Sequence, residues 1–318
     1  MLSPLHQQLS QTLRETHLQQ LGQKYRGKVR DTYRRGDRLV IVTTDRLSAF
    51  DHVLTTIPFK GEVLNRLAAF WFDRTRHVVK NHVLDVPDPN VTVARLCEPV
   101  KVEMVIRGYL TGSLWRDYQK SAPTGYGLRL PPGLKKDQKF ETPLITPSTK
   151  ADLGQHDEPI SEEEILARGL ADPKGWQEIR EAALALFSEG QKWAASRGLI
   201  LVDTKYEFGR ANGELLVIDE MHTPDSSRFW VAAEYQDRFD RGADQRMLDK
   251  ENIRQWLINE RGFSGHGALP EIPTEVRVDL AMKYLAAYEQ LTGAPLELQC
   301  GDVHARIEAN LRAQGLLP

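Results

Sequence analysis

Three charged residues alternate along a short stretch that is otherwise mostly apolar, LVDTKYEFG at residues 201–209. Successive side chains of a β-strand point to opposite faces, so Asp203, Lys205 and Glu207 are expected to share one face of a strand. An acid, a base and an acid along one strand can serve a metal ion and a charged substrate. The alternative is a solvated strand face whose charges pair across a hairpin.

The residues that follow predict a second strand with further acids. Asn212-Gly213 is a strong signal for a hairpin turn, and ELLVIDEM then returns antiparallel, which brings Asp219 close to Glu207. A few carboxylate oxygens completed by substrate phosphates are the usual ligands of Mg²⁺. A turn of two residues would place Asp219 and Glu207 on opposite faces. A shared metal therefore predicts an odd loop, such as a three-residue connection with a bulge.

Two further segments combine cations with hydroxyls, as phosphate sites do. TPDSSR follows the second strand and contains Ser226 and Arg228, and an arginine beside serines suits a phosphate. VIRGYLTGSLW places Arg107 and Ser113 near a strand-to-helix turn, where backbone N–H groups favour an anion. PDSS is equally typical of an ordinary turn with a helix N-cap, so the pattern alone leaves both interpretations open.

Near the N-terminus, GQKYRGK at residues 22–28 matches the spacing of a phosphate-binding P-loop. The next residue, Val29, lacks the hydroxyl that such a loop uses for Mg²⁺, and KVRDTY continues as a strand instead of a helix. A P-loop is therefore rejected. A glycine-containing hairpin with Lys28 and Arg30 on one face can still cover phosphates, as in kinase-like nucleotide sites. The alternative is a solvated basic strand.

The elements that must position these residues are predicted from periodicity and turn signals. An amphipathic helix is expected at about 5–21, followed by a β-hairpin around RRGD, a helix within 61–79, and two strands separated by a break near Glu98-Pro99. Later elements are a short helix in TGSLWRDYQKS, long loops at about 121–160, a capping-box helix start at Ser161, a strong helix ending near Gly198, and three helical patterns beyond about 240. Strands that do not alternate regularly with helices predict an α+β fold instead of a doubly wound sheet.

The composition of the chain is that of an ordinary globular protein. Its 318 residues, 41% of them hydrophobic, suffice for two moderate domains or one large one. A net charge of −2 provides no strong basic field for nucleic acid. Cys97 and Cys300 have no metal or redox spacing and suggest a reducing compartment. The polar N-terminus lacks the apolar core of a signal peptide, and no apolar run is long enough to span a bilayer, so a soluble, cytoplasmic protein is expected.

Six motifs in order resemble those of the SAICAR synthetase family, the phosphoribosylaminoimidazole-succinocarboxamide synthases of purine biosynthesis. They are YRGKVRDTY, DRLSAFD, IRGYLTGSLW, TPSTKADLGQHDEPIS, LVDTKYEFG and IDEMHTPDSSRFW. The resemblance spans about residues 22–260, with LDKENIRQWL as a weaker late match. The long central loop and the chain length resemble the longer form of the family, found in fungi and some bacteria.

The resemblance implies an ATP-dependent ligase that joins 5-amino-1-(5-phosphoribosyl)imidazole-4-carboxylate, a carboxylated aminoimidazole ribonucleotide, to L-aspartate. It also implies a small β-rich domain that covers the nucleotide, at 1–105, an ATP-grasp-like domain at 106–240, and a C-terminal helical region packed on the core, at 241–318. The expected partners are these small molecules, without nucleic acid or membrane, and the expected assembly is a monomer or a small homo-oligomer.

The resemblance also assigns roles to individual residues by motif match. The phosphates of ATP would contact Gly27, Lys28 and Arg30, and its adenine would contact Glu98, Val100 and Val102 at the strand break. Mg²⁺ would be held by Glu207 and Asp219, which with Lys28 and Arg30 form the catalytic set. The ribonucleotide would be surrounded by Arg107, Ser113, Asp203, Lys205, Ser226 and Arg228. L-aspartate is assigned loosely, to Asp45, Ser48 and Asp51 in DRLSAFD and to Ser148 and Lys150 in the central loop.

The implied chemistry follows from the substrates. A carboxylate is a poor electrophile, so ATP would convert it to an acyl phosphate before the aspartate amine attacks. Mg²⁺ and the cations would offset charge on the moving phosphoryl group, and positioning would do most of the rest. No nucleophilic cysteine or serine is nominated. The rival interpretations are a small-molecule kinase of related fold, which needs a base for an acceptor hydroxyl, and a non-catalytic nucleotide sensor.

Two residues depart from the pattern expected of the family. Gln155 occupies a position in the central loop where an acid is expected, so the side chain supplies no charge there. His222 lies where an aliphatic residue is expected. It either packs in the core or gives the activity a pH dependence near neutrality.

Overall fold

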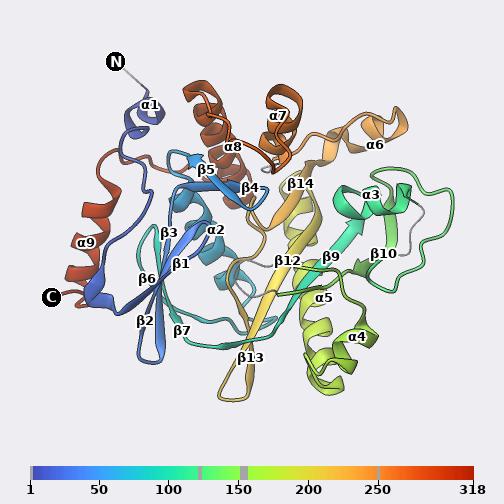
Figure 1. Cartoon of the computed structure of the whole chain (residues 1–318), viewed down its shortest axis with the longest axis horizontal. Helices are drawn as coiled ribbons and strands as arrows, with labels where there is room; N and C mark the ends of the chain where they lie inside the picture. Colours follow the sequence, from blue (N-terminus) through green and yellow to red (C-terminus); the bar gives the residue numbers. More distant parts are fainter. Residues whose placement is uncertain (1–2, 121–123, 151–156, 249–250) are drawn as a thin grey trace. The chain divides into compact units, whose positions relative to one another are not determined.

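The computed structural model describes residues 3–120, 124–150, 157–248 and 251–318 (Figure 1). The chain divides into two compact units. Unit 1 consists of Met1–Phe72, His82–Leu96 and Leu248–Pro318, and unit 2 consists of Asp73–Asn81 and Cys97–Met247. The three predicted segments, 1–105, 106–240 and 241–318, stay a prediction about domains. The units have other limits because the C-terminal helices group with the N-terminal sheet.

Unit 1 contains an antiparallel sheet of five strands in the order β1-β2-β3-β7-β6. These strands are β1 (Gln23–Arg26), β2 (Arg30–Arg35), β3 (Arg38–Thr43), β6 (Val83–Asp88) and β7 (Val91–Arg95). A separate hairpin is formed by β4 (Arg46–Ala49) and β5 (His52–Thr56). The hairpin predicted around RRGD is confirmed, since Arg35 lies opposite Arg38 in the β2–β3 ladder.

The helices of unit 1 come from both ends of the chain. They are α1 (Pro4–Gln8), the 3₁₀ turn η1 (Gln19–Leu21), α2 (Lys60–Arg74, whose last residues belong to unit 2), α7 (Glu251–Arg261), α8 (Thr274–Thr292) and α9 (Val303–Ala313). The core of the sheet joins strand residues Tyr33, Val40 and Val42 to Ile307 and Leu311 of α9. The last helix therefore completes the core of the N-terminal sheet (Figure 1).

The helix predicted at about 5–21 is wrong beyond its first residues. α1 is short, and the chain from Leu9 to Leu18 forms a turn and then irregular backbone without a helix. The backbone N–H of Leu13 donates to Asp45 Oδ2 at 2.7 Å, and the N–H of Thr16 donates to Asp31 Oδ2 at 2.7 Å. Because buried carboxylates satisfy amides that a helix would pair internally, the segment is stable without helical hydrogen bonds. Its leucines are buried in the core of the sheet instead.

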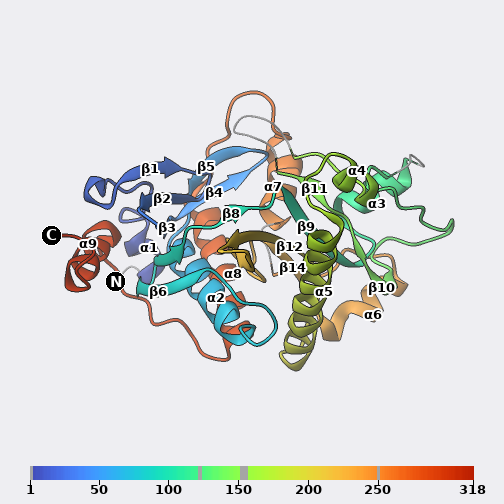
Figure 2. The same ribbon diagram turned by 90° about the horizontal axis from the view of Figure 1, so that it is seen from below.

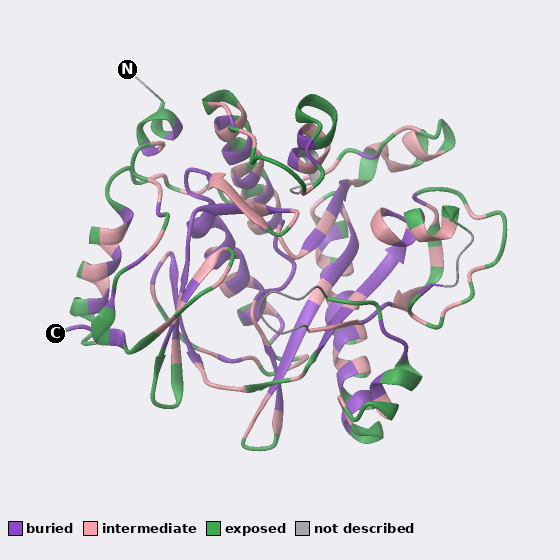
Figure 3. Cartoon of the chain, viewed as in Figure 1, coloured by how far each residue is buried: buried purple, intermediate pink, exposed green. Residues whose placement is uncertain are grey.

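Unit 2 is built around one long strand, β12 (Leu199–Ala211), which pairs with four others. The remaining strands of its seven-stranded sheet are β8 (Glu98–Pro99), β9 (Val102–Tyr109), β10 (Lys139–Ile145), β11 (Ser148–Thr149), β13 (Glu214–Ile218) and β14 (Ser227–Val231). Both β12 and β9 are buried along most of their length (Figure 3). The centre of the sheet is therefore the most rigid place in unit 2 for a site.

Four helices accompany this sheet: α3 (Gly112–Gln119), α4 (Glu162–Ala167), α5 (Pro173–Ser196) and α6 (Ala232–Asp240). α5 packs against β12 and β9 (Figure 2). The predicted capping box is confirmed, because Ser161 and Glu164 exchange hydrogen bonds at the start of α4. The α+β fold is confirmed as well. Within the described ranges, no helix is both long enough and apolar enough to cross a membrane.

Candidate active site

The alternating charges on β12 lie on one face of the strand, as the sequence predicts. Asp203, Lys205 and Glu207 contact charged partners on other segments of unit 2. On the other face, Tyr206 and Phe208 are fully buried. The strand therefore presents a polar face while its opposite face holds it in the core.

Asp203 lies between two arginines because β12 is flanked by β9 and β14. It is opposite Arg107 in one ladder and opposite Arg228 in the other. Asp203 Oδ2 accepts hydrogen bonds from Arg107 Nη1 at 3.3 Å and from Arg228 Nη1 at 2.6 Å. One carboxylate thus fixes two guanidinium groups, and the cluster keeps a net positive charge that suits an anion.

The start of α3 adds hydroxyl and backbone groups to these arginines. Arg107 donates from Nη2 to Ser113 Oγ at 3.2 Å and from Nε to Thr146 Oγ1 at 2.9 Å. A Cβ on Gly112 would lie 2.7 Å from Arg228 Nη2, so the guanidinium packs directly on the glycine backbone. The φ angle of Gly112 is also positive, at 60°. Only glycine allows this close approach of an arginine to the helix start.

Ser226 is held by a tight turn before β14. Its Oγ accepts a hydrogen bond from the backbone N–H of Thr223 at 3.1 Å, and its carbonyl accepts one from the N–H of Lys205 at 3.0 Å. The predicted ribonucleotide residue Ser226 is therefore tied to the middle of β12.

A chain of alternating charges continues along β12. Lys205 Nζ donates to Glu103 Oε1 at 2.7 Å and to Glu207 Oε1 at 3.0 Å, while Lys150 pairs with Glu207 Oε2. Burial alone would raise the pKa of Glu207, but the charges of Lys205 and Lys150 outweigh it and hold this pKa well below its usual range. Glu207 is therefore a carboxylate at any physiological pH.

Glu103 and Lys205 complete this chain with pKa shifts of their own. Burial raises the pKa of Glu103, and repulsion by Glu207 adds to the shift against the attraction of Lys205. Burial would lower the pKa of Lys205, but Glu207, Glu103 and Asp219 together raise it. The ammonium of Lys205 is therefore the shared counter-ion of three acids.

The odd loop predicted between β12 and β13 is wrong. Ala211 lies opposite Glu214 and Glu207 opposite Ile218, so Asn212-Gly213 forms a turn of two residues. Asp219 is instead released from the ladder, because β13 ends one residue earlier and Asp219 adopts a left-handed φ of 68°. Its charge acts on Lys205, the neighbour of Glu207. The strand register that the prediction required is therefore absent, and a magnesium site shared by Glu207 and Asp219 stays a prediction.

Glu207 and Asp219 fit a magnesium ion in the manner common for nucleotide enzymes. Among the described residues, no group of three His, Cys, Asp or Glu side chains is placed to hold a metal. Mg²⁺, however, is usually bound by one or two carboxylates, with water and substrate phosphates as the other ligands. Glu207 is ionised, and it shares the counter-ion Lys205 with Asp219, so the donor chemistry is that of such a site.

The strand break predicted near Glu98-Pro99 lies along the edge of β12. β8 pairs with β12 at Gly209 and Arg210, and the N–H of Val100 donates to the Phe208 carbonyl at 2.8 Å. A Cβ on Gly209 would lie 2.8 Å from Cys97 Cβ, so glycine is required for this approach.

The three predicted adenine residues differ in exposure at this break. Glu98 is exposed and Val100 half-buried, whereas the side chain of Val102 is buried in the core. Val102 can therefore offer a ligand only its backbone.

In unit 1 the predicted phosphate-contacting residues occupy the turn between β1 and β2. The N–H of Gly27 donates to the Arg30 carbonyl at 2.8 Å, which closes the turn. The Lys28 side chain is 60% exposed and pairs with Asp51, which lies in the β4–β5 turn. The structure therefore brings together Lys28 and Asp51, which were assigned separately to ATP and to aspartate.

Asp45 does not have the exposure of a ligand-binding residue. It is fully buried, and its two oxygens accept hydrogen bonds from the N–H groups of Leu13 and Gly61 at 2.7 and 2.8 Å. Burial raises the pKa of Asp45 to about 6. Its placement argues for a role in the fold. Ser48, on β4, and Ser148, on β11, are both half-buried.

Comparison with known proteins identifies the family. A model of the SAICAR synthetase family matches residues 23–266. The chain is similar to phosphoribosylaminoimidazole-succinocarboxamide synthases from Legionella pneumophila (strain Paris), with 47% identity over 94% of this chain and 97% of the relative, and from Bacteroides fragilis (strain ATCC 25285), with 48% identity over 92% and 95%. The chain belongs to the SAICAR synthetase family.

A solved structure supports the same assignment for the fold. The SAICAR-synthase from Saccharomyces cerevisiae, complexed with SAICAR, superposes with a TM-score of 0.79 at 33% identity, covering 90% of this chain and all of that one. The likeness to that SAICAR-synthase therefore extends over nearly the whole chain.

Two residues that contact the predicted set were missed by the sequence analysis. Glu103 binds Lys205, and Thr146 binds Arg107. Glu103 and Arg107 are four positions apart within an apolar strand, so they share a face by the same alternation that was used to find the charges on β12. That signal predicts Glu103. Thr146 lies on a loop and has no comparable signal.

His222 is a packing residue. It is completely buried, its Nε2 lies 2.5 Å from the Tyr206 hydroxyl, and burial lowers its pKa to about 3. It therefore does not titrate near neutrality, which answers one of the two departures from the family pattern. Gln155, the other departure, lies outside the described residues.

Proposed function

We propose that this chain is the ATP-dependent ligase that joins 5-amino-1-(5-phosphoribosyl)imidazole-4-carboxylate to L-aspartate. The products are the succinocarboxamide, ADP and phosphate, in de novo purine biosynthesis. The observation that carries the proposal is the family match over residues 23–266, with relatives near 47% identity across almost their full length. The charged face of β12 supplies groups suited to that chemistry.

The ribonucleotide phosphate is assigned to the arginine cluster of unit 2. Arg107 and Arg228 are fixed by Asp203, and Ser113 adds a hydroxyl at the start of α3. Two guanidinium groups on one carboxylate leave an unbalanced positive charge, and planar guanidinium groups bind phosphate oxygens in pairs. Lys205 and Ser226 adjoin this cluster and are assigned to the rest of the ribonucleotide.

The phosphates of ATP, its adenine and Mg²⁺ are each assigned to a separate set of residues. Gly27, Lys28 and Arg30 of the β1–β2 turn contact the phosphates, and Glu98, Val100 and Val102 contact the adenine. Glu207 and Asp219 hold Mg²⁺, which when bound offsets negative charge on the ATP phosphates. In the absence of metal, Lys205 and Lys150 balance the charge of Glu207, so this carboxylate is kept ionised and oriented.

The reaction requires activation of a carboxylate. The substrate carboxylate attacks the γ-phosphorus of ATP, ADP leaves, and an acyl phosphate forms. The aspartate amine then attacks the acyl carbon, phosphate leaves, and the nitrogen loses a proton to give the amide. The cations Lys28 and Arg30 stabilise the transferring phosphoryl group, and the fixed arginines hold the ribonucleotide in place, so the protein contributes mainly electrostatics and positioning.

L-aspartate is assigned to Ser48 and Asp51 of the β4–β5 hairpin and to Ser148 and Lys150 of the central loop. The buried Asp45 supports this hairpin by binding two backbone amides. No nucleic acid or membrane is expected to bind. We further propose a cytoplasmic location, a monomer or small homo-oligomer, and an ATP-grasp-like domain within unit 2.

The test is ADP release from Mg-ATP with the ribonucleotide and L-aspartate, each omitted in turn. Release that needs both substrates and yields the succinocarboxamide is the expected result. Release with the ribonucleotide alone would indicate an acyl phosphate lost to water. Absence of release under every combination would overturn the proposal and favour a nucleotide sensor, whereas phosphorylation of a hydroxyl compound would favour a kinase.

A further inference from the structure

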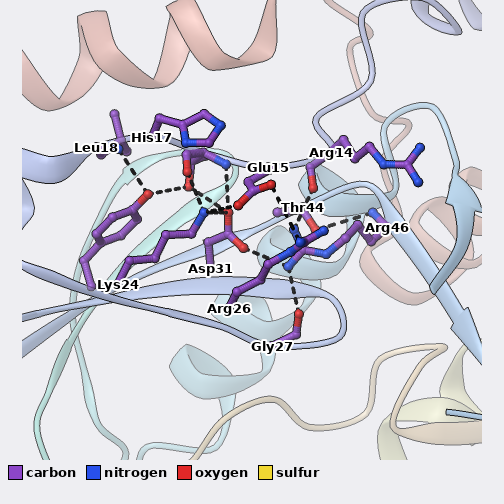
Figure 4. Close-up of polar contacts among 12 residues, drawn as sticks. Arg14, Glu15, His17, Leu18, Lys24, Arg26, Gly27, Asp31, Thr44 and Arg46 are labelled. Carbon is purple, nitrogen blue, oxygen red and sulfur yellow. Dashed lines mark hydrogen bonds and ion pairs between the residues drawn. The ribbon is translucent and has the colours of Figure 1, made fainter. Parts of the chain in front are cut away.

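Arg46, at the start of β4, is completely buried although it carries a full charge. It donates four hydrogen bonds within unit 1 (Figure 4). Nε donates to the Lys28 carbonyl at 3.0 Å, and Nη2 donates to the Gly27 carbonyl at 3.0 Å and to Asp31 Oδ1 at 2.8 Å. Nη1 donates to the Arg14 carbonyl at 2.6 Å. The guanidinium therefore holds the β1–β2 turn through hydrogen bonds to two of its carbonyls, from the buried side of the turn.

The next carbonyl of the turn is held in the same way. Thr44 donates to the Val29 carbonyl twice, from Oγ1 at 2.7 Å and from its backbone N–H at 3.0 Å. Three consecutive carbonyls, those of Gly27, Lys28 and Val29, are thus directed into the protein. Each of them accepts a hydrogen bond from a buried side chain.

This arrangement fixes where the amides of the turn point. In a planar trans peptide, the carbonyl of one residue and the N–H of the next point in opposite directions. Inward carbonyls at residues 27–29 therefore direct the N–H groups of Lys28, Val29 and Arg30 away from Arg46 and Thr44. Successive backbone N–H groups with a common direction form an anion-binding concavity. The exposed Lys28 side chain adds a positive charge to the same turn.

Asp31 keeps Arg46 in place. Its Oδ2 accepts from the backbone N–H of Thr16 at 2.7 Å and from Thr16 Oγ1 at 2.9 Å, and Lys24 Nζ lies 3.2 Å away (Figure 4). Burial would raise the pKa of Asp31, but the hydrogen bonds from Thr16 and Arg46 lower it below its ordinary value. The acid therefore stays charged and restrains the guanidinium through β2.

We propose that Arg46, held by Asp31, is a positioning residue for ATP, because it orients the amides of the Gly27–Arg30 turn toward the phosphates. This proposal rests on the assignment of that turn to ATP. Arg46 does not itself touch the nucleotide, since it is buried beneath the backbone it holds. A lysine could still pair with Asp31. Its ammonium lacks the flat fork that reaches the Gly27 and Lys28 carbonyls together.

The experiment compares full-length Arg46→Lys and Thr44→Val with the wild type. Affinity for ATP is measured by equilibrium binding, and KM for ATP, ribonucleotide and L-aspartate by ADP release. Arg46→Lys is expected to weaken ATP binding about tenfold, and Thr44→Val about threefold, since each loses inward donors of different strength. The KM values for the other two substrates are expected to change less than about twofold.

Arg306→Lys is the matched control. Arg306, on α9 of unit 1, is also partly buried and pairs with Glu62 and Asp88. Within the described residues, its hydrogen bonds go to Glu62, Asp88 and Asn90, which lie outside the β1–β2 turn. The control is expected to lower thermal stability and to leave ATP affinity within about twofold. Equal weakening of all three substrates in Arg46→Lys, or ATP affinity unchanged in a folded variant, would overturn the proposal.

Three further results decide the proposal if one variant does not fold, or separate it from the proposed function. If Arg46→Lys does not fold, Thr44→Val decides, and unchanged ATP affinity in that variant overturns the positioning role. If the wild type binds ATP with this sensitivity but forms no succinocarboxamide, the ligase assignment fails and the positioning role stands. Ligation by the wild type with no effect of either substitution on ATP affinity would refute the positioning role alone.

Discussion

The two units each contain an aspartate bound to arginine, and the two arrangements differ in exposure. In unit 1, the side chains of Asp31 and Arg46 are both 0% exposed, and the arginine also donates hydrogen bonds to backbone carbonyls. In unit 2, Asp203 binds Arg107 and Arg228, and the Arg228 side chain remains 20% exposed. The first arrangement is closed to solvent, whereas the second leaves part of one guanidinium exposed.

The difference separates charges that shape the backbone from charges that meet a ligand. A buried ion pair with all its donors satisfied is costly to disrupt and cannot exchange partners. A partly exposed cluster with two cations for one acid retains unbalanced charge, and solvent or substrate can complete it. Lys205 and Lys150, which form ion pairs with Glu207, are also partly exposed, with side-chain exposures of 34% and 37%.

The strongest test of the open cluster is Glu207→Ala. Turnover is expected to fall by about 100-fold or more, because the variant loses the proposed metal ligand and one of the three acids that share Lys205. The measurement is the rate of ADP release at saturating substrates. Glu214→Ala is the matched control, since Glu214 lies on the same hairpin and pairs, within the described residues, with the exposed Lys80. A loss below about threefold in a folded Glu207→Ala would place catalysis elsewhere.

A second substitution tests the phosphate site itself. Arg228→Lys keeps the charge but removes the planar fork, so KM for the ribonucleotide is expected to rise about tenfold, with KM for ATP nearly unchanged. Initial rates at varied substrate give both constants. Arg210→Lys, at the far end of β12 where Arg210 pairs with Glu178, serves as the control. A parallel rise in both KM values would contradict a cluster dedicated to the ribonucleotide.

The packing behind β12 is tested by Gly190→Ala in α5. An added Cβ would lie 2.4 Å from His222 Cε1 and 2.7 Å from Leu201 Cδ2, so overpacking is expected to cost about 1–3 kcal/mol of unfolding free energy. Urea denaturation measures the change. In a His222→Ala background the same substitution is expected to cost less. Equal costs in both backgrounds would show that His222 is not the obstacle.

The smallest expected effect concerns pH. An unfolded chain protonates His222 below its ordinary pKa of 6.5, whereas in the fold burial lowers that pKa to about 3. The unfolded state therefore binds the proton first, and stability falls as the pH drops from about 6.5 toward 3. His222→Asn, which does not titrate and tolerates the positive φ of 53° at this position, is expected to reduce the loss between pH 7 and pH 5 by about 1–2 kcal/mol. An unchanged pH dependence of the urea midpoint would contradict the burial effect.

The sequence predicted the open cluster better than the closed one. Charges that alternate along an apolar strand are conspicuous, so the face carrying Asp203, Lys205 and Glu207 was predicted correctly. The strand register predicted for Asp219 was wrong, because the left-handed conformation of a single residue does not show in a pattern of period two. Its real cause is local backbone conformation after the strand ends.

The closed cluster could not be predicted because its partners are brought together only by the fold. Arg46 meets Asp31 and the Gly27 carbonyl across 15 and 19 residues of chain. The leucines of the N-terminal segment have helical spacing, yet Asp45 and Asp31 bind that segment in a non-helical form. Periodicity reports which side chains are buried, and it does not report which distant polar group will bind the backbone.

The assembly of unit 1 from three separate segments affects the order in which the chain folds during synthesis. Unit 2 has all its residues once Met247 has emerged from the ribosome. The N-terminal sheet is made first, but its core also requires Val303, Ile307 and Leu311 of the last helix. Since domains fold as units during translation, unit 2 is expected to fold before unit 1. Until the last helix has been synthesised, the N-terminal strands are expected to expose apolar surface, to which chaperones are expected to bind.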